Sequence, residues 1–158
     1  MTTPTPPNTN PTMPVRVEME LNQVREQILL VVPARPEMWA IVRMTASAIA
    51  SRLDYSFEEV EDLRLAVTEL CSSCAVGAEP GAKCELRFEV SPDRLEMTLE
   101  VGPVVDIAPE VTQDHVMTML ELSEQILLAT VDSHEIEPID NGIRRGSLRK
   151  DCDPVALR

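Results

Sequence analysis

The side chains with the clearest chemical potential lie on one predicted helix. Glu69 and Ser73 are four positions apart in the segment EDLRLAVTELCSSC, so both side chains fall on one face of that helix. A carboxylate one turn from a hydroxyl makes a catalytic pair geometrically possible. The alternative is that Glu69 is a solvated residue on the helix surface.

Four cysteines and two histidines are the other candidates for chemistry. The cysteines are expected to be reduced, buried structural thiols, because the pattern around the Cys-x-x-Cys pair is helical and apolar and no histidine lies close in sequence. A redox or metal role is the alternative. Neither His115 nor His134 lies in a recognisable catalytic setting, so a surface or half-buried position is expected for both. The four cysteines are Cys71, Cys74, Cys84 and Cys152.

Composition limits the classes of partner. A net charge of -13 over 158 residues repels the phosphate backbone of nucleic acids and the anionic surface of membranes. Aromatic residues make up only 3% of the chain, which leaves few stacking platforms for single-stranded nucleic acid. The expected macromolecular partner is therefore a protein with a basic surface. The one basic cluster is too small to argue for DNA and is expected to pair with acidic residues of its own or a neighbouring subunit; it comprises Arg144, Arg145, Arg149 and Lys150.

The length predicts a single domain. Residues 1–14 contain only Thr, Pro, Asn and Met, which predicts a disordered tail, followed by a domain over 15–151 and a C-terminal tail over 152–158. No stretch approaches the roughly 18 apolar residues of a membrane span. The N-terminus lacks the basic segment and apolar run of a signal peptide, so a cytoplasmic location is expected.

Hydrophobic periodicity predicts the element order β-α-α-β-β-α-β-β. The clearest boundary is Ser56-Phe57-Glu58-Glu59, a capping box ahead of a periodic apolar stripe. We expect a two-layer α/β domain with helices packed on one face of a mixed sheet. The predicted elements are a strand at 26–32, a helix from 36 to about 53, a helix from 56 to 74, a loop at 76–81, hairpin strands at 84–90 and 95–101, a helix at 114–132 and short strands around Ile136 and Leu148.

The stretch from Pro36 to Val76 resembles the N-terminal half of the anti-sigma serine kinases of the general stress response. Those kinases belong to the GHKL superfamily, which shares a Bergerat-like ATPase fold. The similarity continues through the segment PDRLE at 92–96 and fades after Asp106. The resemblance implies a homodimer that uses ATP and Mg²⁺, binds a sigma factor, and phosphorylates a serine of an anti-anti-sigma protein.

The resemblance also assigns nucleotide motifs to this chain, where they are degenerate. In the family motif Glu-x-x-x-Asn the Glu assists the attacking hydroxyl and the Asn coordinates Mg²⁺; the matching positions are Glu69 and Ser73. In Asp-x-Gly-x-Gly the Asp binds adenine; here Glu100 and Gly102 match the first two positions, and Val104 replaces the second glycine. A longer carboxylate and a β-branched residue are expected to narrow the pocket.

The third family motif, a glycine-rich lid over the phosphates, falls near 121–123, where the sequence reads Glu-Leu-Ser. No glycine occurs between Pro103 and Asn141, so a backbone nest for phosphate is not expected. The region from Leu95 to Ile143 also contains eleven Asp or Glu residues and no Lys or Arg. A triphosphate would meet electrostatic repulsion there.

Three functions follow from these motifs. The first is an anti-sigma factor of a partner-switching system with little or no kinase activity, whose partner surface includes Glu37 and Arg43 of the first helix. The second is an active serine kinase that phosphorylates an anti-anti-sigma protein. The third is a module that binds only that anti-anti-sigma protein.

Overall fold

The computed structural model describes residues 26–106 and 113–152, so the predicted tail at 1–14 and most of the predicted tail at 152–158 lie outside the described residues. The predicted order of elements is confirmed. The elements are β1 (Glu26–Pro33), the 3₁₀ turn η1 (Pro36–Met38), α1 (Trp39–Ala50), α2 (Phe57–Cys74), β2 (Ala78–Ser91), β3 (Arg94–Val104), α3 (Gln113–Thr130), β4 (Ser133–Ile136) and β5 (Arg144–Asp151).

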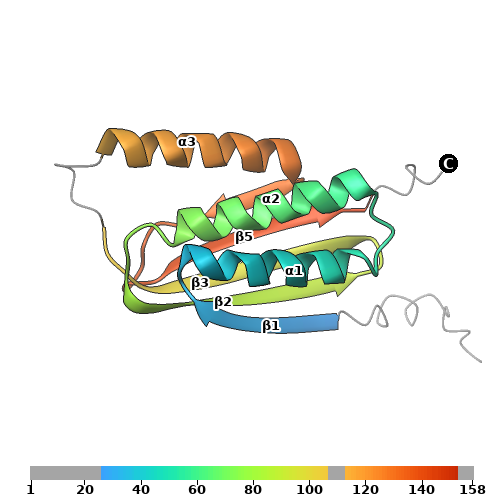
Figure 1. The fold of residues 1–158 in the computed structure, drawn as a ribbon, viewed down its shortest axis with the longest axis horizontal. Helices are drawn as coiled ribbons and strands as arrows, with labels where there is room; N and C mark the ends of the chain where they lie inside the picture. The colour runs from blue at the N-terminus through green and yellow to red at the C-terminus, as the bar shows by residue number, and fades with distance from the viewer. Residues whose placement is uncertain (1–25, 107–112, 153–158) are drawn as a thin grey trace, which may run out of the picture.

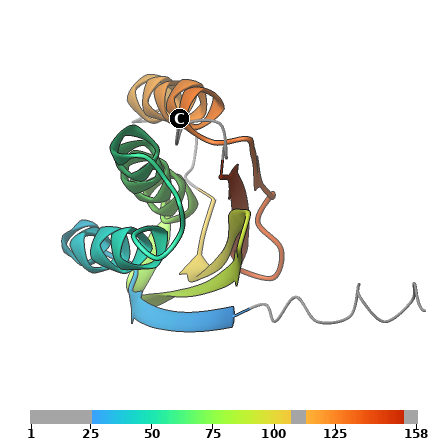
Figure 2. The same ribbon diagram turned by 90° about the vertical axis from the view of Figure 1, so that its right-hand side faces the viewer.

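The elements form two layers, with the three helices on one face of a five-stranded sheet (Figures 1 and 2). The two-layer α/β fold class is therefore confirmed. The strand order is β1-β2-β3-β5-β4, and every described pairing is antiparallel, so the expectation of a mixed sheet was wrong in this respect. β3 and β4, which flank α3 in the chain, run parallel to each other, but β5 lies between them and pairs antiparallel with both.

The start of α2 is fixed by the predicted capping box. The Glu59 N–H donates to Ser56 Oγ at 3.2 Å, and the Ser56 N–H donates to Glu59 Oε2 at 2.6 Å. These two bonds satisfy backbone donors that the first turn of a helix leaves unpaired. α1 begins one turn later than predicted, because its first turn around Pro36 is the 3₁₀ helix η1.

The core lies between the sheet and the inner faces of α1 and α2. The apolar stripe that predicted α2 faces the core, with Val60 half-buried and the other members buried: Leu63, Val67, Leu70, Cys71 and Cys74. Packing onto the central strands is close: a Cβ added at Gly146 of β5 would lie 2.7 Å from Cys74 Sγ and 3.1 Å from Leu70 Cδ1. A glycine at this position lets α2 approach the sheet backbone.

The predicted loop at 76–81 was only partly correct. β2 already begins at Ala78, which pairs with Val104, and the register shifts before Lys83 pairs with Gly102. Pro80 and Gly81 lie within this irregularity, where a missing amide donor and a positive φ of 86° interrupt regular pairing. Among the described residues, no helix is long and apolar enough to cross a membrane.

Candidate functional site

The two candidate residues of α2 have different surroundings. Glu69 is half-buried, and its Oε2 accepts a hydrogen bond from Ser123 Oγ of α3 at 2.6 Å. Ser123 is itself buried, with 7% of its surface exposed. The carboxylate that matches the family's catalytic Glu is therefore bonded to a hydroxyl of the same chain.

Ser123 comes from the segment that matches the glycine-rich lid. α3 runs without interruption from Gln113 to Thr130, so this segment is helical. Inside a helix the backbone N–H groups donate to carbonyls one turn earlier and are not free to surround an anion. The segment therefore continues the helix predicted at 114–132.

Ser73 faces the protein interior. It is 3% exposed, and its Oγ has no hydrogen-bond partner among the described residues. Its carbonyl oxygen accepts a bond from Arg144 Nη1 at 3.2 Å, and the carbonyl of Val76 accepts another from the same atom at 2.8 Å. The guanidinium thus satisfies carbonyls at the C-terminal end of α2, where a cation is favourable.

Glu100 lies on the opposite side of the sheet from α2. Side chains alternate along β3, and its neighbours Leu99 and Val101 are buried under the helices, while Glu100 is exposed on the other face. There its Oε1 accepts a hydrogen bond from Arg145 Nε at 2.7 Å. The structure does not bring Glu100 together with Glu69 and Ser73.

Gly102 is covered by the turn that precedes β5. A Cβ added there would lie 3.2 Å from the carbonyl oxygen of Gly142 and 3.3 Å from Ile143 Cγ1. The Gly102–Pro103 peptide is cis, and the Val104 N–H donates to the Gly142 carbonyl at 2.8 Å. This glycine therefore permits a close contact within the chain.

These placements test whether the chain fits ATP with Mg²⁺. Glu69 is engaged by Ser123, Ser73 is buried, and Glu100 lies on the other face of the sheet. The residues at the family positions do not fit a magnesium-bound nucleotide.

The predicted partner-binding residues lie at the start of the helical layer. Glu37 of η1 is exposed, as expected. Arg43 was expected to be exposed, but it is half-buried between α1 and α2, where its Nη1 donates to Thr68 Oγ1 at 3.4 Å. Ile41 is one of the apolar residues whose spacing predicted this helix, yet it is exposed, as is Met44, which the sequence did not single out.

The C-terminal basic cluster pairs with acidic residues of its own chain, which confirms one of the two predicted outcomes. Arg145 contacts Glu100, and Lys150 Nζ lies 3.7 Å from Asp62 Oδ2 of α2. Lys150 Nζ also donates to the Thr130 carbonyl at the end of α3 at 2.8 Å. The cluster therefore links the sheet to α2 and α3.

Three of the four thiols are buried as predicted, and both histidines agree with the structural interpretation. Cys71, Cys74 and Cys84 are free and buried, and Cys152 is half-buried. Burial raises the pKa of the Cys74 thiol to about 12, which keeps it protonated and unreactive at neutral pH. His134 Nε2 lies 3.0 Å from Glu124 Oε1, and His115 is exposed.

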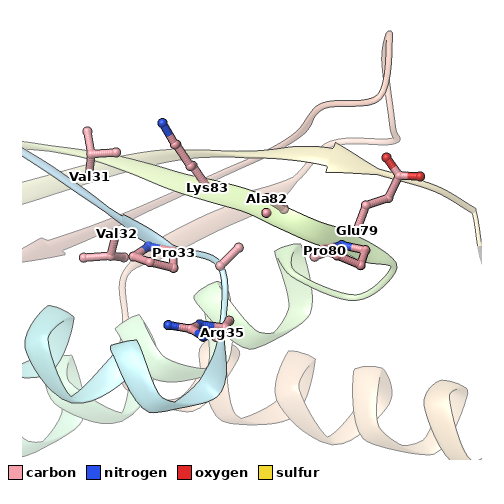
Figure 3. Close-up of a pocket in the computed structure, with 11 residues that line it drawn as sticks. Val31, Val32, Pro33, Arg35, Glu79, Pro80, Ala82 and Lys83 are labelled. Carbon is pink, nitrogen blue, oxygen red and sulfur yellow. The ribbon is translucent and has the colours of Figure 1, made fainter.

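A cavity of about 680 Å³ lies where β1 ends and β2 begins, and no sequence signal pointed to it. It is lined mainly by small apolar residues, with Arg35, Glu79 and Lys83 as its charged members. Figure 3 shows Lys83 and Arg35 pointing to opposite sides of the strand pair. The two cations therefore do not converge on one ligand.

Comparison with known proteins agrees with the resemblance found in the sequence. The chain is 40% identical over 82 residues to the serine-protein kinase RsbW of Bacillus pumilus, covering 49% of this chain and 51% of that protein. It is 40% identical over 75 residues to RsbW of Bacillus subtilis and 38% identical over 73 residues to that of Halalkalibacterium halodurans, with 46% of this chain covered in each case and 47% and 45% of those proteins. No family model matches the chain. The chain spans about half the length of the curated relatives it matches, and over that half the resemblance to serine-protein kinases is confirmed.

Proposed function

We propose that this chain, similar over half its length to serine-protein kinases, is an anti-sigma factor with little or no kinase activity. It sequesters an alternative sigma factor in a partner-switching stress response and is released by an anti-anti-sigma protein. It acts in the cytoplasm as a homodimer, and its partner surface includes Glu37 and the α1 region around Arg43.

One observation carries the loss of kinase activity. The Glu69 carboxylate, which would assist the attacking hydroxyl, already accepts a hydrogen bond from Ser123 of α3 at 2.6 Å. Ser123 stands where the lid glycines of the family would meet the phosphates, and it does so inside a continuous helix. A competing hydroxyl would first have to displace this contact.

Charge supports a basic protein as the partner. The chain has 27 Asp or Glu residues against 14 Lys or Arg residues. Sigma factors bind DNA through basic helices, so an acidic partner gains encounter rate and can cover those helices. Opposite charge thus favours a sigma factor over a nucleic acid.

The test is a pull-down from the native host combined with a phosphate-transfer assay. We expect tagged full-length protein to recover a sigma factor together with a small antagonist, and labelled ATP to leave that antagonist unlabelled. Recovery of the antagonist without any sigma factor would instead support a module that binds only the antagonist.

The retained Glu69 favours one alternative, an active serine kinase, because its carboxylate is only half-buried. Melting temperature with and without ATP and Mg²⁺ separates the two functions. A ligand at a hundred times its Kd stabilises a protein by about 2.7 kcal/mol. We expect no shift at millimolar ATP, and a clear shift would favour the kinase.

A further inference from the structure

We propose that an apolar strip along α2 and α3 binds a basic amphipathic helix of the protein partner. The α2–α3 strip comprises Leu65 of α2 and Met119, Leu122 and Ile126 of α3. Naming the owner of that helix as the sigma factor rests on the proposed function, whereas the binding of a basic amphipathic helix does not.

The contact between Ser123 and Glu69 sets the geometry of the strip. α2 and α3 lie side by side and run in opposite directions (Figures 1 and 2). The buried face of α3 holds Ser123, Leu127 and Thr130, spaced four and three positions apart. Residues one position earlier, such as Leu122 and Ile126, therefore flank this face on one side, and residues one position later flank it on the other.

The two flanks of α3 face different neighbours. Glu124, on the later flank, pairs with His134 of β4. The earlier flank, which holds the strip, therefore faces away from β4 and lies on the side of α2. On α2, Leu65 is one turn before Glu69 and so lies on the same side of that helix. The strip thus spans the outer boundary between the two helices.

The strip is apolar and open to solvent. Leu122 is 61% exposed, Met119 is 51% exposed and Leu65 is 43% exposed. Single exposed apolar residues are ordinary, but a contiguous group marks an interaction site. Met119, Leu122 and Ile126 cover about 10 Å of helix length, enough to contact two turns of a partner helix.

The opposite flank of α3 is also apolar in part but is interrupted by charge. Met117 is 49% exposed and Leu128 is 61% exposed, yet Glu121 and Glu124 lie between them along the same flank. The strip has no such interruption on α3. The strip and the opposite flank of α3 are therefore similarly exposed, but on α3 only the strip is an apolar surface without charged residues in it.

Charge decides which occupant fits. Beside the strip, α2 carries Glu58, Glu61 and Glu69 on the same side as Leu65, and α3 carries no Lys or Arg; its Glu121 and Glu124 lie on the opposite flank. A second copy of this chain would bring the same negative charge to the strip and be repelled. A helix with an apolar stripe flanked by Lys or Arg satisfies both the strip and its surroundings.

The experiment compares two double variants of the full-length chain. M119Q/L122Q alters the strip, and M117Q/L128Q alters the opposite flank. Each variant replaces one Met and one Leu by Gln, and the replaced side chains are almost equally exposed in the two variants. The probes are the recovered sigma factor and a labelled 18-residue peptide designed from Leu and Lys as an amphipathic helix. A peptide with Glu in place of Lys serves as the charge control.

We expect M119Q/L122Q to raise the Kd for both probes roughly tenfold, because central apolar residues dominate binding energy, and M117Q/L128Q to leave both unchanged. Thermal melts by circular dichroism confirm that both variants are folded. Equal Kd values for the two variants, or equal binding of the Lys and Glu peptides, would overturn the proposal that the strip binds a basic helix. If no sigma factor is recovered, the proposed function fails, while the peptide titration still decides whether the strip binds a basic helix.

Discussion

The hydrogen bond between Ser123 and Glu69 can be weighed by a double-mutant cycle with Ser123→Ala and Glu69→Ala. A hydrogen bond to a charged group contributes about 1.5–3 kcal/mol, and the half-burial of Glu69 places this one near the lower limit. Alanine at 123 also favours the helix by roughly 0.5 kcal/mol over serine, which partly hides the loss in the single variant. The cycle removes this contribution, because it is present in both Ser123→Ala arms.

We expect a coupling energy of about 1.5 kcal/mol in the free energy of unfolding, measured by urea titration. In a matched cycle, Glu121→Ala replaces Ser123→Ala, since Glu121 is an exposed residue of the same helix. That pair should be additive within about 0.3–0.5 kcal/mol. A coupling for Ser123 and Glu69 that is no larger than the Glu121 value would refute the contact as a bond between α2 and α3.

The same Ser123→Ala variant tests whether the Ser123 hydroxyl alone prevents ATP from binding. We expect no thermal shift with millimolar ATP and Mg²⁺ in the variant, because Ser73 remains buried and Glu100 remains on the other face of the sheet. A shift that appears only in the variant would mean that the loss of nucleotide binding rests on Ser123 alone.

Three further predictions concern the packing of the domain. Because burial raises the pKa of Cys74 to about 12, a thiol reagent at pH 8 should modify the half-buried Cys152 rapidly and Cys74 only after denaturant is added; rapid modification of Cys74 in native protein would contradict its burial. Ser56→Ala removes the side-chain acceptor of the capping box and should lower the unfolding free energy in urea by about 1 kcal/mol, whereas an unchanged midpoint would count against the cap. Gly146→Ala should cost about 1–3 kcal/mol in the same assay, because the new Cβ would lie 2.7 Å from Cys74 Sγ, and adding Cys74→Ala should recover part of the loss.

Local patterns predicted most of the elements. The capping box at Ser56 fixed the start of α2 because its bonds join residues three positions apart. The alternation through Cys84 to Val90 likewise identified a strand with one buried face, which the structure confirms. In both cases the pattern that decides the structure lies within a few residues of sequence, so it can be recognised without knowledge of the fold.

The arrangement of the site could not be predicted from local patterns in the same way. The alternation along β3 places Glu100 on the face opposite Leu99 and Val101, but the motif match that grouped Glu100 with Glu69 and Ser73 takes no account of which face of the sheet each residue occupies. Ser123 and Glu69 are separated by 54 positions, and no periodic pattern marks their contact. The antiparallel sheet likewise depends on β5 lying between β3 and β4, a choice made by tertiary packing.

Hydrogen bonds within the chain hold α3 in position. A lid that closes over a nucleotide would instead depend on its ligand for its position. Ser123 bonds to Glu69 of α2 near the middle of the helix, and Lys150 Nζ of β5 donates to the Thr130 carbonyl at its end. Just beyond the helix, Asp132 Oδ2 accepts from the Asp151 N–H at 2.7 Å. Since these contacts need no ligand, the surface along α2 and α3 is already formed in the free protein. A preformed surface loses less conformational entropy on binding, so the absence of a fitting nucleotide site is compatible with tight binding of another polypeptide.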